Sequence, residues 1–249
     1  MSNWNDPQPS NRGAWSGFGA SASFAPANQA AYDMGLRRYM LSIYNYMASG
    51  VLLSGIVALL FASSGAAAAV FATPLRWLIA LAPLGFVMAM SFGLNRMQTS
   101  TLKALFWGFA VAMGLSLSSI FFVYTGPSIA STFFATAAAF AGLSLVGYTT
   151  KKSLSGFGTF LIMGVWGLLA AMVINMIWPS QGLGLVISLL GVLIFAGLTA
   201  YDTQRLKQTY SYVAGTEMAG KVVVMGALSL YLDFINMFTF LLQLLGDRR

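Results

Sequence analysis

Seven apolar stretches, each about twenty residues long, take up most of this 249-residue sequence. A helix of ~20 apolar residues is long enough to cross the ~30 Å hydrocarbon core of a bilayer. Only 8% of the residues are charged, whereas a soluble domain has about 25%. Because so few charges cannot cover a surface with water-compatible groups, most of that surface must face lipid. The sequence therefore predicts one all-α integral membrane domain with seven transmembrane helices.

The predicted spans are separated by short segments that contain Pro, Gly, Lys or Arg. They lie at about Tyr39–Ser63, Trp77–Gly93, Ala104–Tyr124, Ser128–Tyr148, Phe157–Trp178, Gly182–Tyr201 and Gly226–Gly246. Asp202–Lys221, between the last two spans, is predicted to be a polar loop. Residues 1–35 are rich in Asn, Ser, Gly, Ala and Pro and lack the apolar core of a signal peptide. We predict a disordered cytoplasmic tail there, followed by a membrane domain over 36–249.

The basic residues predict that the N-terminus is cytoplasmic. With that orientation, ten of the thirteen Lys and Arg residues lie in inside segments and three lie outside, which follows the positive-inside rule. Arg248 and Arg249 conflict with this rule, because seven full spans place them outside. A re-entrant last segment would place them inside, but we prefer seven spans. The net charge of +7 comes from these loops, and no basic face interleaved with aromatics suggests nucleic-acid binding. The predicted location is the cell (inner) membrane.

The absence of two reactive residue types limits the reactions and metal sites that this protein can support. The sequence contains no cysteine and no histidine. This excludes disulfides, thiolate chemistry, Ser-His catalysis, histidine zinc sites and histidine proton relays. No cofactor and no enzymatic activity are expected.

Two acidic residues lie within or at the edge of an apolar span, Asp202 and Asp233. A charge inside a membrane costs several kcal/mol and is rarely kept without a function. Helical periodicity places each of them on a stripe of polar and small residues. The stripe of the last span contains Gly226, Ser229, Asp233, Asn236, Phe240 and Gln243; the stripe of the sixth contains Gly184, Ser188, Gly191, Phe195, Leu198 and Asp202. A last helix surrounded by the other six would keep its stripe, with Ser229, Asn236 and Gln243, away from lipid.

The two carboxylates can meet only if Asp202 sits inside its helix, because Asp233 lies about 10 Å deeper, seven residues beyond Gly226 at ~1.5 Å each. If they meet in a dry site, they cannot both ionise cheaply, so the pair would share one proton near neutral pH and lose it as the pH rises. Ionised, the same oxygens would suit Ca²⁺. Arg96, at the cytoplasmic end of the second span, is the best-placed cation to act as a gating partner.

A simpler interpretation exists for each residue. Asp202 could be an exposed acid at a helix end beside Arg205, and Asp233 could make a structural hydrogen bond. Arg96 could do no more than mark the topology.

Three segments of the chain resemble the Bax inhibitor-1 family of multi-pass membrane proteins, in its bacterial branch. They are ALSLYLDFINMFTFLLQLLG at 227–246, AYDTQRLK at 200–207 and RRYMLSIYNYMASG at 37–50. The resemblance covers about residues 35–249. It implies seven helices, with six around the last.

The resemblance also implies a function, because several members of that family act as pH-sensitive Ca²⁺ leak channels. The family's paired aspartates fall on Asp202 and Asp233, and its gating arginine falls on Arg96, within the looser match FGLNRMQTS. Some bacterial relatives instead bind a membrane-anchored protease. We therefore expect a pH-sensitive Ca²⁺ leak channel, with a regulator that binds membrane partners such as a protease as the alternative.

An intramembrane aspartyl protease is the rival enzyme. Tyr201-Asp202 fits its first motif, but Asp233 follows Leu230-Tyr231-Leu232 and lacks the Gly-x-Gly that the second motif needs. A retinal protein is excluded because no lysine follows Lys221.

Overall fold

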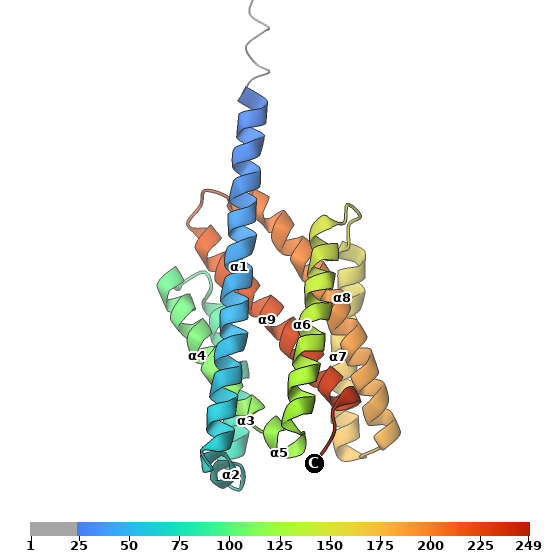
Figure 1. The fold of residues 1–249 in the computed structure, drawn as a ribbon. Coiled ribbons are helices and arrows are strands. Elements are labelled where there is room, and N and C mark those ends of the chain that lie inside the picture. Colours follow the sequence, from blue (N-terminus) through green and yellow to red (C-terminus); the bar gives the residue numbers. More distant parts are fainter. Residues whose placement is uncertain (1–23) are drawn as a thin grey trace, which may run out of the picture. The chain divides into compact units, whose positions relative to one another are not determined.

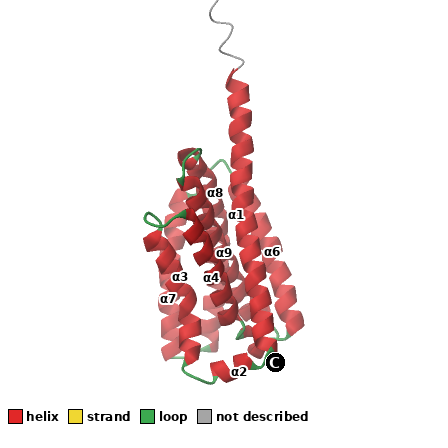
Figure 2. Cartoon of the chain, turned by 90° about the vertical axis from the view of Figure 1, so that its left-hand side faces the viewer, coloured by secondary structure: helices red, strands yellow, loops and turns green. Residues whose placement is uncertain are grey.

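The computed structural model describes the backbone of residues 24–249. The chain divides into two units, 1–38 and 39–249, and the packing described below concerns the second. The described part of the chain is helical and contains no strand. Its helices are α1 (Phe24–Ser63), α2 (Ala66–Phe71), α3 (Leu75–Gly93), α4 (Thr99–Leu117), α5 (Ile120–Val123), α6 (Gly126–Thr149), α7 (Ser155–Ile177), α8 (Gln181–Val213) and α9 (Met218–Leu245). Figure 1 shows their order along the chain, and Figure 2 shows the short loops that connect them.

The all-α membrane fold is confirmed. Within residues 24–249, seven segments are long and apolar enough to cross a bilayer: Gln29–Ser63, Leu75–Gly93, Thr99–Val123, Gly126–Thr149, Ser155–Ile177, Gln181–Val213 and Met218–Leu245. Each overlaps one predicted span. The third consists of α4 and α5, separated by a turn at Ser118 and Ser119.

The sixth helix is longer than predicted. We predicted an end at Tyr201 and a polar loop over Asp202–Lys221, but α8 continues to Val213. Residues 202–213 contain no glycine or proline, and they keep a buried face that includes Leu206 and Val213. The helix ends before Gly215, whose φ of 76° few other residues tolerate. Asp202 consequently lies well inside α8.

The first helix also differs from the prediction. It begins at Phe24, so residues 24–35, which we assigned to the disordered tail, are helical. Their Ala residues favour a helix, and α1 continues through Gly35 into the first span. The rest of the predicted tail, residues 1–23, lies outside the described residues.

The last helix is the most buried of the seven spans. In its most apolar window 61% of the residues are buried, compared with 11–39% in the other six. It packs against α4, α6 and α8 and contacts α1 through Tyr231, and Figure 1 shows it crossing the bundle obliquely. A complete ring of six helices around α9 stays a prediction.

Candidate functional site

The two polar stripes predicted from the sequence face each other. Near one end of the α8–α9 contact, Ser188 Oγ lies 2.9 Å from Gln243 Oε1. Further along, the rings of Phe195 and Phe240 stack with their centroids 6.0 Å apart. Beyond them, the Ser229 side chain hydrogen-bonds to the carboxylate of Asp202. The faces that helical periodicity defined in the sequence are therefore the surfaces through which α8 and α9 pack.

Asp233 is the buried member of the acidic pair. Its side chain is 5% exposed, and its Oδ2 atom has no hydrogen-bond partner among the described residues. The carboxylate of Asp202 lies close enough to interact with it electrostatically. The structure thus brings the two predicted carboxylates together, as the extension of α8 past Asp202 allows. A buried, uncompensated carboxylate oxygen is expensive in its ionised form.

Asp202 has a more polar environment. It is half-buried, accepts the hydrogen bond from Ser229 and is attracted by Arg205, less than one turn further along α8. The simpler interpretation therefore holds in one respect, since Asp202 does lie beside Arg205. It fails in another, because Asp202 is not at a helix end. The two acids differ in their access to donors and cations.

Two polar residues of the last stripe make different contacts. Asn236 is half-buried, and its Nδ2 donates to the backbone carbonyl of Leu232 at 2.8 Å. Gln243 is exposed and pairs with Ser188. Ser188 Oγ is also 2.9 Å from the Gly184 carbonyl, and its single proton serves one of these two acceptors. Of the three predicted lining residues, only Ser229 touches the acidic pair.

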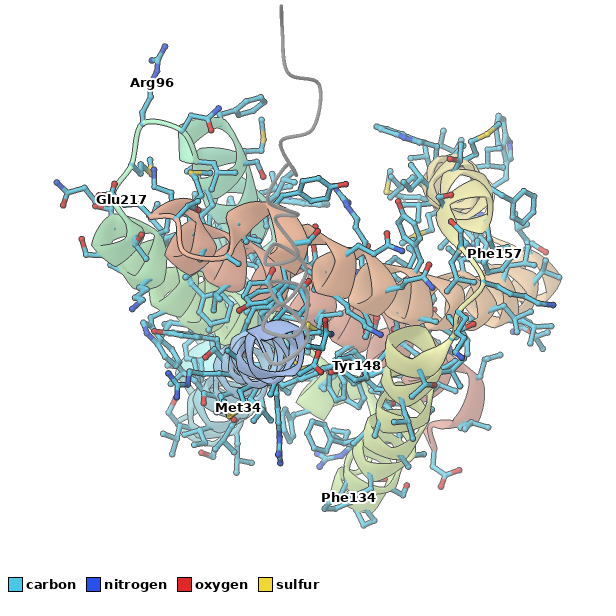
Figure 3. The ribbon with its side chains drawn as sticks, turned by 90° about the horizontal axis from the view of Figure 1, so that it is seen from above. Met34, Arg96, Phe134, Tyr148, Phe157 and Glu217 are labelled. Carbon is cyan, nitrogen blue, oxygen red and sulfur yellow. The ribbon has the colours of Figure 1, made fainter. Side chains whose placement is uncertain are left out.

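Arg96 lies away from the two carboxylates. It is exposed in the turn between α3 and α4, where its backbone N–H donates to Gly93 O at 2.9 Å. Figure 3 shows its side chain directed away from the helices. In this arrangement Arg205 is the cation that acts on Asp202, and a gating contact with Arg96 would require the α3–α4 turn to move.

Sequence reasoning missed a second polar contact of α9. The Tyr231 hydroxyl lies 2.6 Å from Ser54 Oγ, which is 2.6 Å from the Ala110 carbonyl and 3.0 Å from the Gly50 carbonyl. This group joins α1, α4 and α9, and Tyr231 is fully buried. A tyrosine inside an apolar span signals that its hydroxyl needs a partner, but no pattern names the partner.

A tight helix contact positions α8 next to α6. At Gly147 a Cβ atom would overlap the backbone carbonyl of Ala200. Ser144 and Thr203 exchange a hydrogen bond of 3.1 Å in the same interface. Small residues allow such close approach between helices in lipid. This contact fixes the part of α8 that carries Asp202.

The oxygen atoms of the site restrict what it can bind. Among the described residues, no group of three or more His, Cys, Asp or Glu side chains is placed to hold a metal ion. The site offers two carboxylates and the Ser229 hydroxyl, which are hard oxygen ligands of the kind that Ca²⁺ prefers. Because Ca²⁺ takes six to eight oxygens, such a site would bind it with water completing the shell.

Comparison with known proteins gives the family. Residues 36–249 match the family described as "Inhibitor of apoptosis-promoting Bax1". The chain belongs to the Bax inhibitor-1 family. Its match covers the whole predicted membrane domain, so the resemblance read from three short segments is confirmed.

Relatives of this Bax inhibitor-1 family protein occur in several bacteria. An uncharacterized protein of Caulobacter vibrioides is 46% identical over 90% of this chain and 95% of its own length. Protein RP147 of Rickettsia prowazekii is 43% identical, over 88% of this chain and 93% of its own. The inner membrane protein YbhL of Escherichia coli K12 is 42% identical, over 86% of this chain and 94% of its own. With its seven candidate spans, the family member described here is a multi-pass membrane protein.

Proposed function

We propose that this protein is a Ca²⁺ leak channel of the cell membrane, controlled by protonation of the Asp202–Asp233 pair. The observation that carries the proposal is the meeting of these two carboxylates inside the α8–α9 contact. Acids in apolar spans are uncommon because of their cost. Two that share one interface are more costly still, which supports a functional role for the pair.

The environments of the two acids support a division of roles. Asp202 has a hydroxyl donor and a neighbouring cation, so it is suited to carry the charge. Asp233 is buried, and its Oδ2 has no donor among the described residues, so it is suited to hold the proton. The pair would titrate as a unit.

Loss of the proton provides the opening step of the proposed mechanism. Two ionised carboxylates in a dry interface repel each other, and that repulsion would separate α8 from α9. The stacked Phe195 and Phe240 rings lie on the same contact, so separating the helices would also part the rings. The polar stripes would then face water, and their oxygens would be available to a hard cation.

Ca²⁺ flux into liposomes tests whether the protein conducts at all. Purified protein is reconstituted with a Ca²⁺-sensitive dye inside, and flux is compared with empty liposomes across a range of pH. The proposal predicts flux above the empty control that rises as the pair loses its proton. Equal flux in loaded and empty liposomes at every pH would overturn it and favour a regulator that binds membrane partners, such as a membrane-anchored protease.

The orientation is part of the same proposal, with the N-terminus in the cytoplasm. The chain has no cysteine, so a single introduced cysteine gives an unambiguous label. Thr73 and Thr216 are both exposed, in the α2–α3 and α8–α9 connections. A membrane-impermeant maleimide added to intact cells should label Thr73→Cys and leave Thr216→Cys unlabelled until the membrane is opened. The reverse pattern would contradict the orientation.

A further inference from the structure

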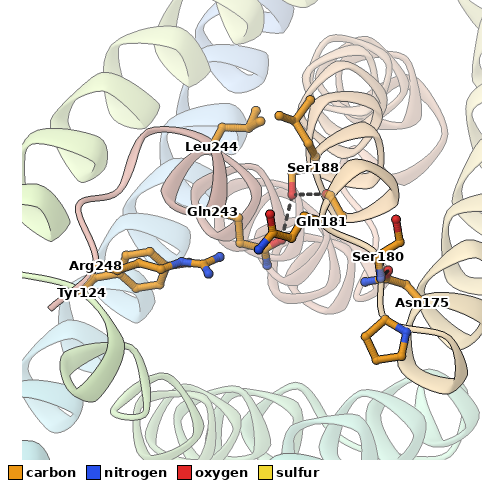
Figure 4. A pocket seen from close by; sticks show the side chains of 11 residues that line it. Tyr124, Asn175, Ser180, Gln181, Ser188, Gln243, Leu244 and Arg248 are labelled. Atoms are coloured by element: carbon orange, nitrogen blue, oxygen red, sulfur yellow. Dashed lines mark hydrogen bonds between the residues drawn. The ribbon is translucent and has the colours of Figure 1, made fainter.

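A second polar site lies where α8 begins and α9 ends, at the far end of the α8–α9 contact from Asp202. A cavity of about 930 Å³ opens there. Its polar side chains come from α7, α8, α9 and the C-terminal segment: Asn175, Ser180, Gln181, Ser188, Gln243 and Arg248. Figure 4 shows the Arg248 side chain extending toward Gln243 and Gln181. A volume of this size is typical of small-molecule sites.

The charge of this cavity has one sign. Arg248 is the single charged residue among those that line it, and no carboxylate is present in the lining. The pair Arg248–Arg249 also breaks the charge bias that places most basic residues at the opposite side of the membrane. Because no acidic side chain lines the cavity beside the Arg248 guanidinium, this cavity is suited to bind an anion.

The neutral groups of the cavity add hydrogen-bond donors. Asn175 Oδ1 accepts from the backbone N–H of Ser180 at 3.0 Å, which leaves its Nδ2 to donate. Gln243 Oε1 lies 2.9 Å from Ser188 Oγ, and the Gln243 amide nitrogen adds two N–H donors. The oxygen of Ser180 accepts from Leu183 N at 3.4 Å, so its hydroxyl proton is available. The cavity therefore offers neutral hydrogen-bond donors beside the guanidinium.

The backbone of the C-terminal segment holds Arg248 in place. Asp247 donates its N–H to Ser128 Oγ at 2.9 Å and accepts from Thr125 N at 3.0 Å. Arg249 N donates to Val123 O at 3.0 Å, and Tyr124 and Arg248 form an antiparallel bridge. These bonds fasten the segment to the α5–α6 connection on both sides of Arg248. The backbone that carries Arg248 is therefore already ordered at the cavity before a ligand binds.

We propose that this cavity binds a phosphate group, either of an anionic lipid headgroup or of a small soluble phosphoester. Arg248 would contact two phosphate oxygens at once, a geometry that the planar guanidinium favours. Asn175, Ser180 and Gln243 would donate to the remaining oxygens, and the volume leaves room for the rest of the head group. The proposal does not rest on the acidic pair or on the channel function, although Ser188 and Gln243 belong to both the cavity and the polar stripes.

The matched variants for a test are Arg248→Gln and Arg249→Gln. Both remove one positive charge from adjacent positions, but only Arg248 lines the cavity. Binding of inorganic phosphate and of glycerol phosphate is measured through the thermal unfolding of each purified protein in detergent. Retention of phosphatidylglycerol against phosphatidylcholine is measured by native mass spectrometry. The proposal predicts about tenfold weaker phosphate binding for Arg248→Gln, since a charged, bidentate contact is lost, and little change for Arg249→Gln.

The two sources of phosphate give different supporting results. Retention of phosphatidylglycerol that disappears in Arg248→Gln assigns the site to a lipid headgroup. Stabilisation by the soluble phosphates without lipid retention assigns it to a soluble phosphoester. The proposal is overturned if Arg248→Gln and Arg249→Gln lose binding equally. It is also overturned if the wild-type protein binds neither the soluble phosphates nor phosphatidylglycerol. Arg248→Lys, which keeps the charge without the planar fork, should recover only part of the affinity.

Discussion

The side chain of Ser229 in α9 hydrogen-bonds to the carboxylate of Asp202 in α8. This bond joins the two helices one turn from Asp233, whose Oδ2 has no partner among the described residues. One acid of the pair therefore has a donor at the interface, while an oxygen of the other does not. The two acids of the pair therefore lie in unequal polar environments.

Ser229→Ala should move the pH response of Ca²⁺ flux to higher pH. The hydroxyl donates to Asp202 and stabilises its ionised form, so its removal makes the doubly ionised pair less favourable. A hydrogen bond to a charged group contributes about 1.5–3 kcal/mol, so its loss should move the midpoint measurably. Ser211→Ala is the control, because Ser211 is exposed and bonds only within its own helix. An unchanged midpoint in Ser229→Ala would show that this bond does not tune the pair.

Arg205→Gln should shift the pH response in the same direction, because Arg205 attracts the Asp202 carboxylate. Arg96→Gln should leave it unchanged, since Arg96 is exposed and directed away from the helices. Both variants remove one positive charge, so each controls for the other in the flux measurement. Loss of pH control in Arg96→Gln alone would support the gating role that the family resemblance implies and would contradict this assignment.

Gly147→Ala should destabilise the packing of α6 against α8. The added methyl would overlap the Ala200 carbonyl, and backbone cannot move aside as a side-chain end can. Overpacking of this kind costs about 1–3 kcal/mol. Gly142→Ala is the matched change on the same helix, where a Cβ meets nothing within 4 Å. In detergent, Gly147→Ala should unfold at a lower temperature than Gly142→Ala. Equal unfolding temperatures would contradict the close approach of Gly147 to the Ala200 carbonyl.

Tyr231→Phe should lower stability modestly. It removes the hydroxyl that lies 2.6 Å from Ser54 Oγ, and hydrogen bonds between membrane helices contribute about 0.6 kcal/mol on average and up to about 1.7. Tyr212→Phe serves as the control because Tyr212 is 84% exposed. The free energy of unfolding is measured for both. The free energy of unfolding should fall in Tyr231→Phe only. If the two variants are equally stable, the Tyr231 hydroxyl does not help to hold α9 in place.

The spans and the contacting helix faces could be predicted from the sequence, because a local residue pattern determines each of them. Apolar length predicted the spans, because lipid leaves few other solutions for an apolar segment of ~20 residues. Periodicity placed Ser188 and Phe195 on one face and Phe240 and Gln243 on another, and these faces do meet. The end of α8 was missed because its last turns are polar on the outside, so hydropathy alone reads them as a loop.

The relative placement of distant segments could not be predicted in this way. Nothing in the residues near Arg248 shows that the C-terminal segment pairs with Tyr124. Similarly, Ser54 gives no sign that it accepts Tyr231 as a partner 177 positions away. Arg96 was predicted to be the best-placed cation for the pair, whereas the structure places Arg205 beside Asp202 within α8. Such contacts depend on helix register, which a single sequence does not encode in any local pattern.

The pH response of Ca²⁺ flux in Asp233→Asn shows whether the buried carboxylate controls the channel. Asparagine keeps the shape of the side chain but cannot ionise, so the pair can no longer become doubly charged. The comparison is with wild type and with Asp247→Asn, which removes an exposed carboxylate outside the pair. We expect Asp247→Asn to retain the wild-type response, whereas flux through Asp233→Asn should no longer change with pH. A wild-type pH response in Asp233→Asn would contradict this expectation.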